Sequence, residues 1–305
     1  MGGATSKDRY DRAVSTGILT LNKQEVKSWR RLTKALKKLS TLRTITISHN
    51  PLRDPVPSAF TALSLWSTLV SLDLSHNSLT CACALGSETP LSKTHVEEAL
   101  ARITMAPARH TAYGFPPLPL ESLNLSGNDL HMLPPLLAVR FPRLRRFVCT
   151  DNKTALNIPL SLARCIGASK SLEVVALQRD RLKTFIVADD TVNNPFPALR
   201  EILLDQNHLG GTVNLGFAAD KEAPILPSLR RISLDDQTGA EPLRHIHATI
   251  FAHCPGLTSF TFHGNCNEAE LHDSLVQSDV YRSWQVRMKD VVDKKLHAGG
   301  QAELI

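Results

Sequence analysis

Few of the reactive side chains in this sequence stand at spacings that a metal site requires. Cys81 and Cys83 are separated by one residue, which is one short of a zinc knuckle, and no second pair follows at zinc-finger spacing. His245 and His247, followed by Cys254, form a similarly weak set that ordinary surface histidines explain better. We therefore expect no metal site.

Catalytic motifs are missing from the sequence as well. It contains no phosphate-binding loop, no nucleophile elbow and no kinase signature. The adjacent Asp189 and Asp190 predict a solvated turn rather than a catalytic pair, and no convergent cluster of titratable residues is visible. We expect no catalytic residue and no cofactor, and an enzyme is the least favoured class.

One modification motif stands at the N-terminus. The residues MGGATSK fit the N-myristoylation pattern, with Gly2 as the acceptor and Ser6 at the required position. A disordered tail is the alternative explanation. Lys7, Arg9 and Arg12 follow directly and favour a membrane role, whereas a second acyl chain beside Gly2 is excluded because no cysteine stands there.

A second basic group follows on the first expected helix, over 22–39, where Trp29, Leu32, Leu36 and Leu39 form an apolar stripe. The other face carries Lys27, Arg30, Arg31, Lys34, Lys37 and Lys38. A solvated helix face is the usual explanation of such a run. Because no acid occurs between Val26 and Asn50, an anionic lipid surface is the functional alternative.

The elements that must position these groups follow from one repeated pattern. Residues 69–79, LVSLDLSHNSL, have leucine and asparagine at the leucine-rich-repeat positions. Leu72 and Leu74 alternate with polar residues, which predicts a short strand with one buried face. Asn77 can hydrogen-bond the backbone where the chain turns after the strand. A single unit cannot bury its own apolar face, so copies must stack on both sides.

The copies are present in phase. Related segments begin at Leu42, Leu69, Leu120, Leu144, Leu172, Leu199, Leu229 and Leu257, which gives about eight repeats. Asp180 takes the asparagine place in one of them, and a weaker ninth strand surrounds Leu19. Most starts lie 24 to 30 residues apart, but 51 separate Leu69 from Leu120. This predicts an insertion over 80–119, either a degenerate repeat or a projecting loop, with a helix over 93–105.

The predicted architecture is an α/β leucine-rich-repeat solenoid, a horseshoe with a concave parallel sheet and a mixed helical and irregular convex side. We expect a flexible, lipidated basic tail over 1–15, the solenoid over 16–268, a C-terminal capping helix over 269–298 and a frayed tail over 299–305. The composition, 42% hydrophobic and 21% charged, suits one globular domain of 305 residues.

The compartment follows from cysteine use and hydropathy. Six cysteines occur without a cluster at either end of the repeats, which favours a reducing compartment. No stretch approaches the roughly 18 apolar residues of a spanning helix, and no signal-peptide core follows Met1. The net charge of +6 indicates acidic partners only loosely.

Both ends resemble the family of leucine-rich repeat-containing protein 57. The similarity covers MGGATSK, then TGILTLN over 16–22, and VYRSWQVRMKDVVDKKL over 280–296 after FHGN. The resemblance implies a small cytoplasmic repeat protein, myristoylated at Gly2 and without catalytic activity. The middle matches only as generic repeats, and the inserted 80–119 departs from the family pattern.

Residues between the inward leucines predict a partner site on the concave face, where apolar side chains stand among charged ones. The candidate residues are Arg146, Val148, Val174, Ala176, Glu201, Leu203 and Arg231. Scattered surface hydrophobes are the alternative. We expect a monomeric, non-enzymatic scaffold that binds a protein, not nucleic acid, on a cytosolic membrane face. The rival is a soluble regulatory subunit of a phosphatase or ubiquitin-ligase complex.

Overall fold

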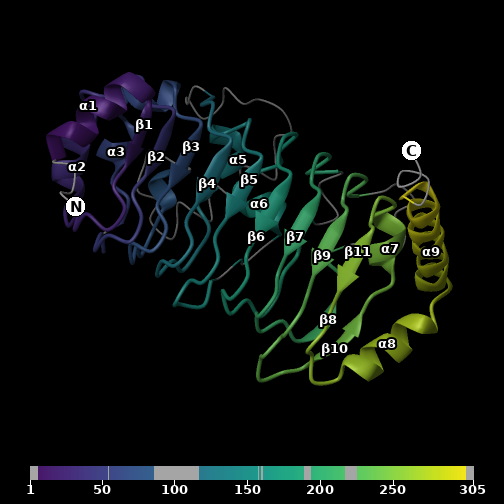
Figure 1. Ribbon diagram of the computed structural model, residues 1–305. Helices are drawn as coiled ribbons and strands as arrows, with labels where there is room; N and C mark the ends of the chain where they lie inside the picture. The colour runs from purple at the N-terminus through teal and green to yellow at the C-terminus, as the bar shows by residue number, and fades with distance from the viewer. Residues whose placement is uncertain are drawn as a thin grey trace.

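A single parallel sheet organises the chain in the computed structural model, which describes residues 6–53, 55–85, 117–156, 158, 161–188, 194–216 and 225–299. Nine strands in these ranges lie side by side in the order β1-β2-β3-β4-β5-β6-β7-β9-β11 (Figure 1). They are β1 (Ile18–Thr20), β2 (Thr44–Thr46), β3 (Ser71–Asp73), β4 (Ser122–Asn124), β5 (Arg146–Val148), β6 (Val174–Ala176), β7 (Glu201–Leu203), β9 (Arg231–Ser233) and β11 (Ser259–Thr261). The eight predicted repeat strands and the weaker first strand are all present, and every pairing is parallel.

Helices lie behind the sheet and at its two ends. Those of the N-terminal part are α1 (Ser6–Thr16), α2 (Trp29–Leu36), α3 (Ser58–Thr61) and the 3₁₀ turns η1 (Ser64–Ser67) and η2 (Cys83–Leu85). Those of the remainder are α5 (Leu137–Arg140), α6 (Leu162–Ile166), α7 (Thr249–His253), α8 (Glu268–Val276) and α9 (Asp279–Gly299). In Figure 1, α1 and α2 lie beside the first strands, whereas α8 and α9 follow the last one.

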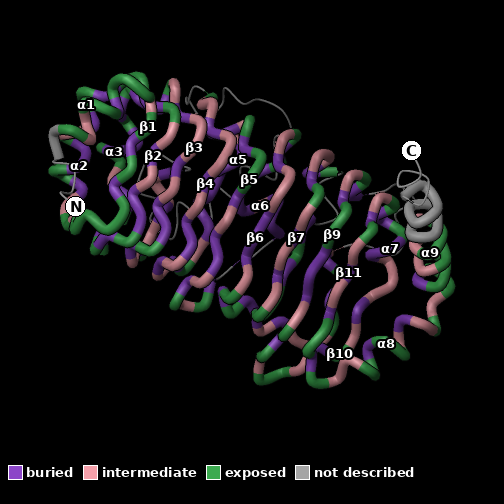
Figure 2. Tube along the Cα trace, viewed as in Figure 1, coloured by how far each residue is buried: buried purple, intermediate pink, exposed green. Residues whose placement is uncertain are grey.

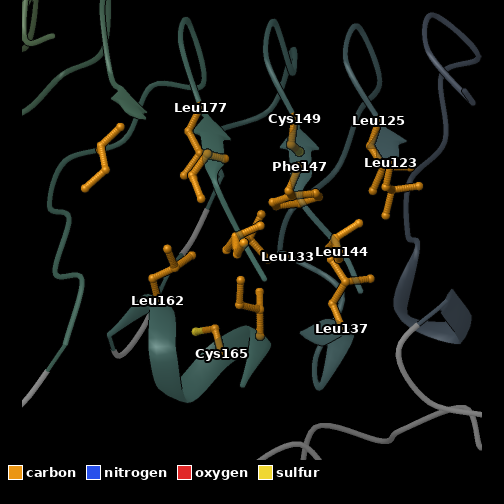
Figure 3. Packing of buried hydrophobic residues seen from close by; sticks show 14 of the residues in the cluster. Leu123, Leu125, Leu133, Leu137, Leu144, Phe147, Cys149, Leu162, Cys165 and Leu177 are labelled. Atoms are coloured by element: carbon orange, nitrogen blue, oxygen red, sulfur yellow. The ribbon is translucent and has the colours of Figure 1, made fainter. Parts of the chain in front are cut away.

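The core lies between the strands and the segments behind them. The middle residue of each strand is buried, as the alternation predicts: Leu19, Ile45, Leu72, Leu123, Phe147, Val175, Ile202, Ile232 and Phe260. In Figure 3, Phe147 and Leu123 point toward leucines such as Leu137 and Leu162 on the opposite side. Each fully buried leucine of this kind stabilises the fold by roughly 1.5–3 kcal/mol, so the stack of coils is held mainly by the inward side chains.

A ladder of buried amides joins the coils where the chain turns after each strand. Asn128 shows the pattern: its Nδ2 donates to the carbonyls of Leu74 (3.0 Å) and Leu125 (2.7 Å). Its Oδ1 accepts from the backbone N–H groups of Asn77 and Leu79, both at 3.0 Å. The ladder positions are Asn50, Asn77, Asn128, Asn152, Asp180, Asn207, Gln237 and Asn265, all buried. Paired amides of this kind satisfy the backbone groups that the turns leave open.

Asp180 is the one charged residue in this ladder. Its Oδ1 accepts from the backbone N–H (2.9 Å) and Nδ2 (3.0 Å) of Asn152, while its Oδ2 has no hydrogen-bond partner among the described residues. Burial, which disfavours the carboxylate, raises the pKa of Asp180 to about 7. A protonated Oδ2 resembles the amide of the neighbouring coils because it also carries a donor hydrogen.

A buried arginine ties the early coils together behind the sheet. The Arg140 guanidinium donates to the carbonyl oxygens of Thr61 (3.1 Å) and Ala84 (3.3 Å) and lies 5.9 Å from the Trp66 ring centroid. Trp66 in turn packs against the Phe60 ring, with centroids 5.6 Å apart. This side chain therefore fixes the short helical turns α3 and η2 relative to α5.

Three predictions about the N- and C-terminal parts of the chain need correction. The predicted flexible tail contains α1 (Ser6–Thr16), because Ala13 is fully buried and Tyr10 packs against the core. The helix expected over 22–39 is shorter, since α2 begins only at Trp29. Lys23 and Glu25 before it adopt left-handed backbone angles, and the Asn50 side chain accepts hydrogen bonds from the backbone of the same turn.

The C-terminal helix expected over 269–298 is instead the pair α8 and α9, separated by Gln277 and Ser278. The break brings Tyr281 and Trp284 onto Phe251, with ring centroids 4.9 and 5.0 Å apart. A second, two-stranded parallel sheet, β8 (Gly211–Val213) with β10 (Leu243–Ile246), was not predicted. The predicted helix over 93–105 and much of the inserted 80–119 lie outside the described residues.

Candidate binding face of the parallel sheet

The register brings all seven predicted partner-binding residues together on four adjacent strands. One row across the sheet pairs Arg146 with Val174, Val174 with Glu201, and Glu201 with Arg231. A second row pairs Val148 with Ala176, Ala176 with Leu203, and Leu203 with Ser233. Neighbouring strands stand about 4.8 Å apart, so these side chains form one continuous surface. We name the seven predicted residues the central patch.

Exposure within the central patch is uneven. Val148, Val174 and Leu203 are half-buried, whereas Arg146 and Arg231 at its two sides are exposed. In Figure 2, buried positions alternate with half-buried or exposed ones along strands such as β3, β5 and β7. Three apolar side chains are thus partly open to solvent between two cations.

Ala176 departs from the prediction, because it is only 3% exposed. Its methyl group is shorter than the side chains of its register partners Val148 and Leu203, which stand on either side of it. Ala176 is therefore recessed between two larger side chains and offers little contact surface to a partner.

A rigid polar network borders the central patch on the β9 side. The Ser233 hydroxyl donates to Asp205 and is 3.0 Å from the Thr261 hydroxyl, which donates to Asp235 Oδ2 at 3.0 Å. Asp235 also accepts from the backbone N–H of His263 at 2.7 Å. Sequence reasoning missed this network, although the aspartates recur two residues after the strand in both repeats.

Charge pairs lie along the turns near the same strands. The Arg145 guanidinium donates to Glu173 at 2.7 Å, and Arg179 Nη2 donates to Asp151 Oδ2 at 2.6 Å. The hydrogen bond from Arg179 lowers the pKa of Asp151. These pairs flank the central patch with fixed charges of both signs.

The basic residues of the N-terminal prediction lie on two neighbouring segments. Lys7 lies in α1, Arg12 is exposed and Arg9 is half-buried; Gly2 lies outside the described residues. The exposed residues on and around α2 are Lys27, Arg30, Arg31, Lys34, Lys37 and Lys38. Arg9, Lys27 and Arg31 line one surface hollow of about 460 Å³.

Sulfur chemistry is concentrated at the turn after β3. The Cys83 N–H donates to Cys81 Sγ at 3.3 Å, and Cys83 Sγ lies 3.5 Å from the Met132 thioether sulfur. A hydrogen bond from the Cys83 side chain favours the Cys81 thiolate and lowers the pKa of Cys81 to about 6.

The other residues considered for metal binding are placed differently. His245 Nδ1 lies 3.0 Å from the Ser274 hydroxyl, and His247 Nδ1 lies 2.8 Å from that of Thr249. Cys254 is fully buried, and burial raises its pKa to about 12. In the described ranges, no three histidine, cysteine or acidic residues are grouped to hold a metal ion. Asp189 and Asp190 lie outside those ranges.

Comparison with known proteins agrees with the repeat architecture. The sequence pattern of the Leucine Rich Repeat family matches residues 119–139, which include β4 and the turn that follows it. No curated protein sequence matches the chain significantly. Together with the large parallel sheet, the match supports a leucine-rich-repeat protein with a solenoid-like α/β fold. Repeats of this class typically act as non-enzymatic modules for protein–protein interaction.

Among the described residues, no helix combines the length and the apolarity needed to cross a bilayer.

Proposed function

We propose that the chain is a scaffold whose protein partner docks on the central patch, on the face that leucine-rich-repeat solenoids make concave. The observation that carries the proposal is the chemistry of the outward positions. On β2, β3 and β4 they are short and polar, namely Thr44, Thr46, Ser71, Asp73, Ser122 and Asn124. On β5 to β7, three of the six equivalent positions hold Val148, Val174 and Leu203, which remain partly exposed.

The physical basis of docking is preorganisation. The strands are fixed by the inward core and the amide ladder, so the patch is ordered before a partner arrives. Half-exposed Val148, Val174 and Leu203 offer apolar contact area. Arg146 and Arg231, on either side, favour a partner with an acidic rim around an apolar centre.

Leu203 gives the sharpest test of this proposal. A photo-crosslinking residue at Leu203 should capture a partner that the same residue at Thr46 does not, because β2 and β7 are five strand spacings, about 24 Å, apart. Leu203→Lys should then weaken binding of the purified partner by more than about tenfold, or 1.4 kcal/mol. Thr46→Lys is the matched control.

Stability must be measured beside binding. Glu201 and Asp205 share the outward side of Leu203 and can accept a lysine, so Leu203→Lys should leave the melting temperature nearly unchanged. Equal capture from Leu203 and Thr46 would place the partner elsewhere and refute the proposal.

A second function, attachment to a cytosolic membrane face, is favoured by the meeting of Arg9 with Lys27 and Arg31 around one hollow. A myristoyl chain on Gly2 would give only marginal binding by itself. Each basic residue near an anionic surface adds about 1 kcal/mol. The six exposed cations on and around α2 could therefore supply the second signal that stable attachment requires.

Vesicle binding separates this proposal from the soluble alternative. Acylated protein should sediment with vesicles containing phosphatidylserine, and Gly2→Ala should abolish this. Glutamine at Arg30, Arg31, Lys34 and Lys37 should reduce it at least tenfold. The control set, with glutamine at four exposed cations distant in sequence, comprises Lys170, Lys183, Arg200 and Arg244. Equal losses for the two sets would contradict a specific basic surface.

A further inference from the structure

Three sulfur atoms from two different coils meet at the turn after β3. Cys83 Sγ lies 3.5 Å from Met132 Sδ, although the two residues are 49 positions apart in the chain. Cys81 belongs to the same group, since its Sγ accepts from the Cys83 N–H at 3.3 Å. All three residues are half-buried, so the group is reachable from solvent.

The turn that carries the two cysteines is held on several sides. Ala82 and Leu85 are fully buried, and the Val56 N–H donates to the Cys81 carbonyl at 3.0 Å. The Arg140 guanidinium donates to the Ala84 carbonyl at 3.3 Å. These contacts fix the cysteine turn without using either thiol.

Met132 is fixed from the other coil. Its neighbours Leu130 and Leu133 are buried in the core, and the Asp129 N–H donates to the Leu79 carbonyl at 2.9 Å. The hydrogen bond joins the Met132 segment to the strand-exit turn two residues before Cys81. The three sulfur atoms are thus positioned by backbone contacts that exist before any ligand arrives.

All three sulfur atoms of this group can donate an electron pair to a cation. The Cys83 thiol donates toward Met132 Sδ, and the Cys81 sulfur accepts from the backbone of the same turn. A cation bound among the three would take Cys81, Cys83 and Met132 as ligands. Thiolate and thioether ligands together select soft ions such as Cu(I), whereas zinc takes thiolate, imidazole and carboxylate ligands in mostly four-coordinate sites.

We propose that Cys81, Cys83 and Met132 bind one Cu(I) ion in a three-sulfur site. Around a centre with metal–sulfur bonds of about 2.3 Å, three ligands in a plane stand about 4 Å apart. The 3.5 Å between Cys83 and Met132 is close to that separation, so only a small outward movement is needed. Binding releases the Cys83 thiol proton, and no oxidation occurs.

The experiment titrates reduced full-length protein anaerobically with Cu(I) alone, in competition with a chromophoric Cu(I) chelator. The parent should bind one equivalent, and X-ray absorption should show only sulfur ligands. The double variant Cys81→Ser, Cys83→Ser should lose this equivalent. Met132→Leu keeps the volume and should weaken binding by roughly tenfold.

Matched variants separate the site from other sulfur atoms. Cys266→Ser removes an exposed thiol, and Met288→Leu changes a half-buried methionine in α9. Both should bind Cu(I) as the parent does, and circular dichroism should report the same fold for every variant. Unchanged binding in the double cysteine variant or in Met132→Leu would overturn the proposal. So would a reduced parent that binds no Cu(I) but readily forms a Cys81–Cys83 disulfide.

Discussion

The early strands β2 to β4 and the central strands β5 to β7 have the same register but different chemistry. Outward positions such as Thr46 and Asp73 are short and polar, whereas Val148 and Leu203 at equivalent positions are apolar. The inward residues are buried in both regions. The fold therefore depends on the inward set, and the outward set is free to differ, which makes it the place where binding specificity can arise.

The two regions differ inside as well. The early ladder residues Asn77 and Asn128 each donate to carbonyls of two coils. In the central region Asp180 takes that place, and its ionised form has no hydrogen to donate. The central coils thus combine apolar residues at some outward positions with one carboxyl group in the interior ladder.

The largest expected effect on stability comes from placing an aspartate, as in the central coils, at an asparagine position of the early ladder. Asn128→Asp removes the donor that serves the Leu74 and Leu125 carbonyls and buries a carboxylate. Because each unpaired buried group costs about 1–3 kcal/mol, the free energy of unfolding should fall by about 4 kcal/mol at pH 8. Urea titration followed by circular dichroism measures this. Asn214→Asp, the same change at an exposed turn, should have little effect, and a similar loss at both sites would contradict the role of the ladder.

The reverse exchange, Asp180→Asn, should stabilise the central coils. The pKa of Asp180 is about 7 in the folded chain, against about 3.9 when unfolded. Between these values the folded state holds a proton that the unfolded state has released, so stability falls as pH rises from about 4 to 7. Asp180→Asn should therefore raise the free energy of unfolding by about 3–4 kcal/mol at pH 8. At pH 5 this gain should be smaller by about 2–3 kcal/mol.

Urea titrations of Asp180→Asn and its parent at both pH values measure this difference. A gain that is equal at pH 5 and pH 8 would mean that Asp180 is ionised throughout that range in the folded chain. The exposed Asn214→Asp variant again serves as the control.

The smallest expected effect concerns the surface of the central coils. The side chains of Arg179 and Asp151 are 55% and 36% exposed, so solvent screens their ion pair. Arg179→Gln should lower the free energy of unfolding by less than about 1 kcal/mol, and added salt should shrink the difference. A loss above about 2 kcal/mol would show that the charge pairs, rather than the buried ladder, distinguish the central region.

The regular part of the fold was predictable because its signal is periodic. Leucines such as Leu72 and Leu123 fix the strand phase, and all predicted strands lie where that phase puts them. The alternation also placed Arg146 and Val174 side by side correctly. Ala176 was misjudged because its burial depends on the size of side chains on the neighbouring strands, which a single repeat does not contain.

Other features depend on contacts that the repeat pattern does not encode. Cys83 and Met132 meet across 49 residues that include the irregular insertion, so no spacing rule could join them. Asp180 was recognised at an asparagine position, but its raised pKa follows from burial, which only the stacked coils create. The strands β8 and β10 lie outside the leucine repeat pattern that predicted the strands of the large sheet.

The distribution of tryptophan has a spectroscopic consequence. Trp29 and Trp66 lie at the start of the stack, and Trp284 lies at its far end, donating to the Leu257 carbonyl at 2.8 Å. Tryptophan fluorescence therefore reports on the two ends of the stack and does not report on the coils around Asp180. Stacked repeats are coupled only to their neighbours. Unfolding curves from tryptophan emission and from circular dichroism will therefore coincide only if the central coils unfold together with the two ends.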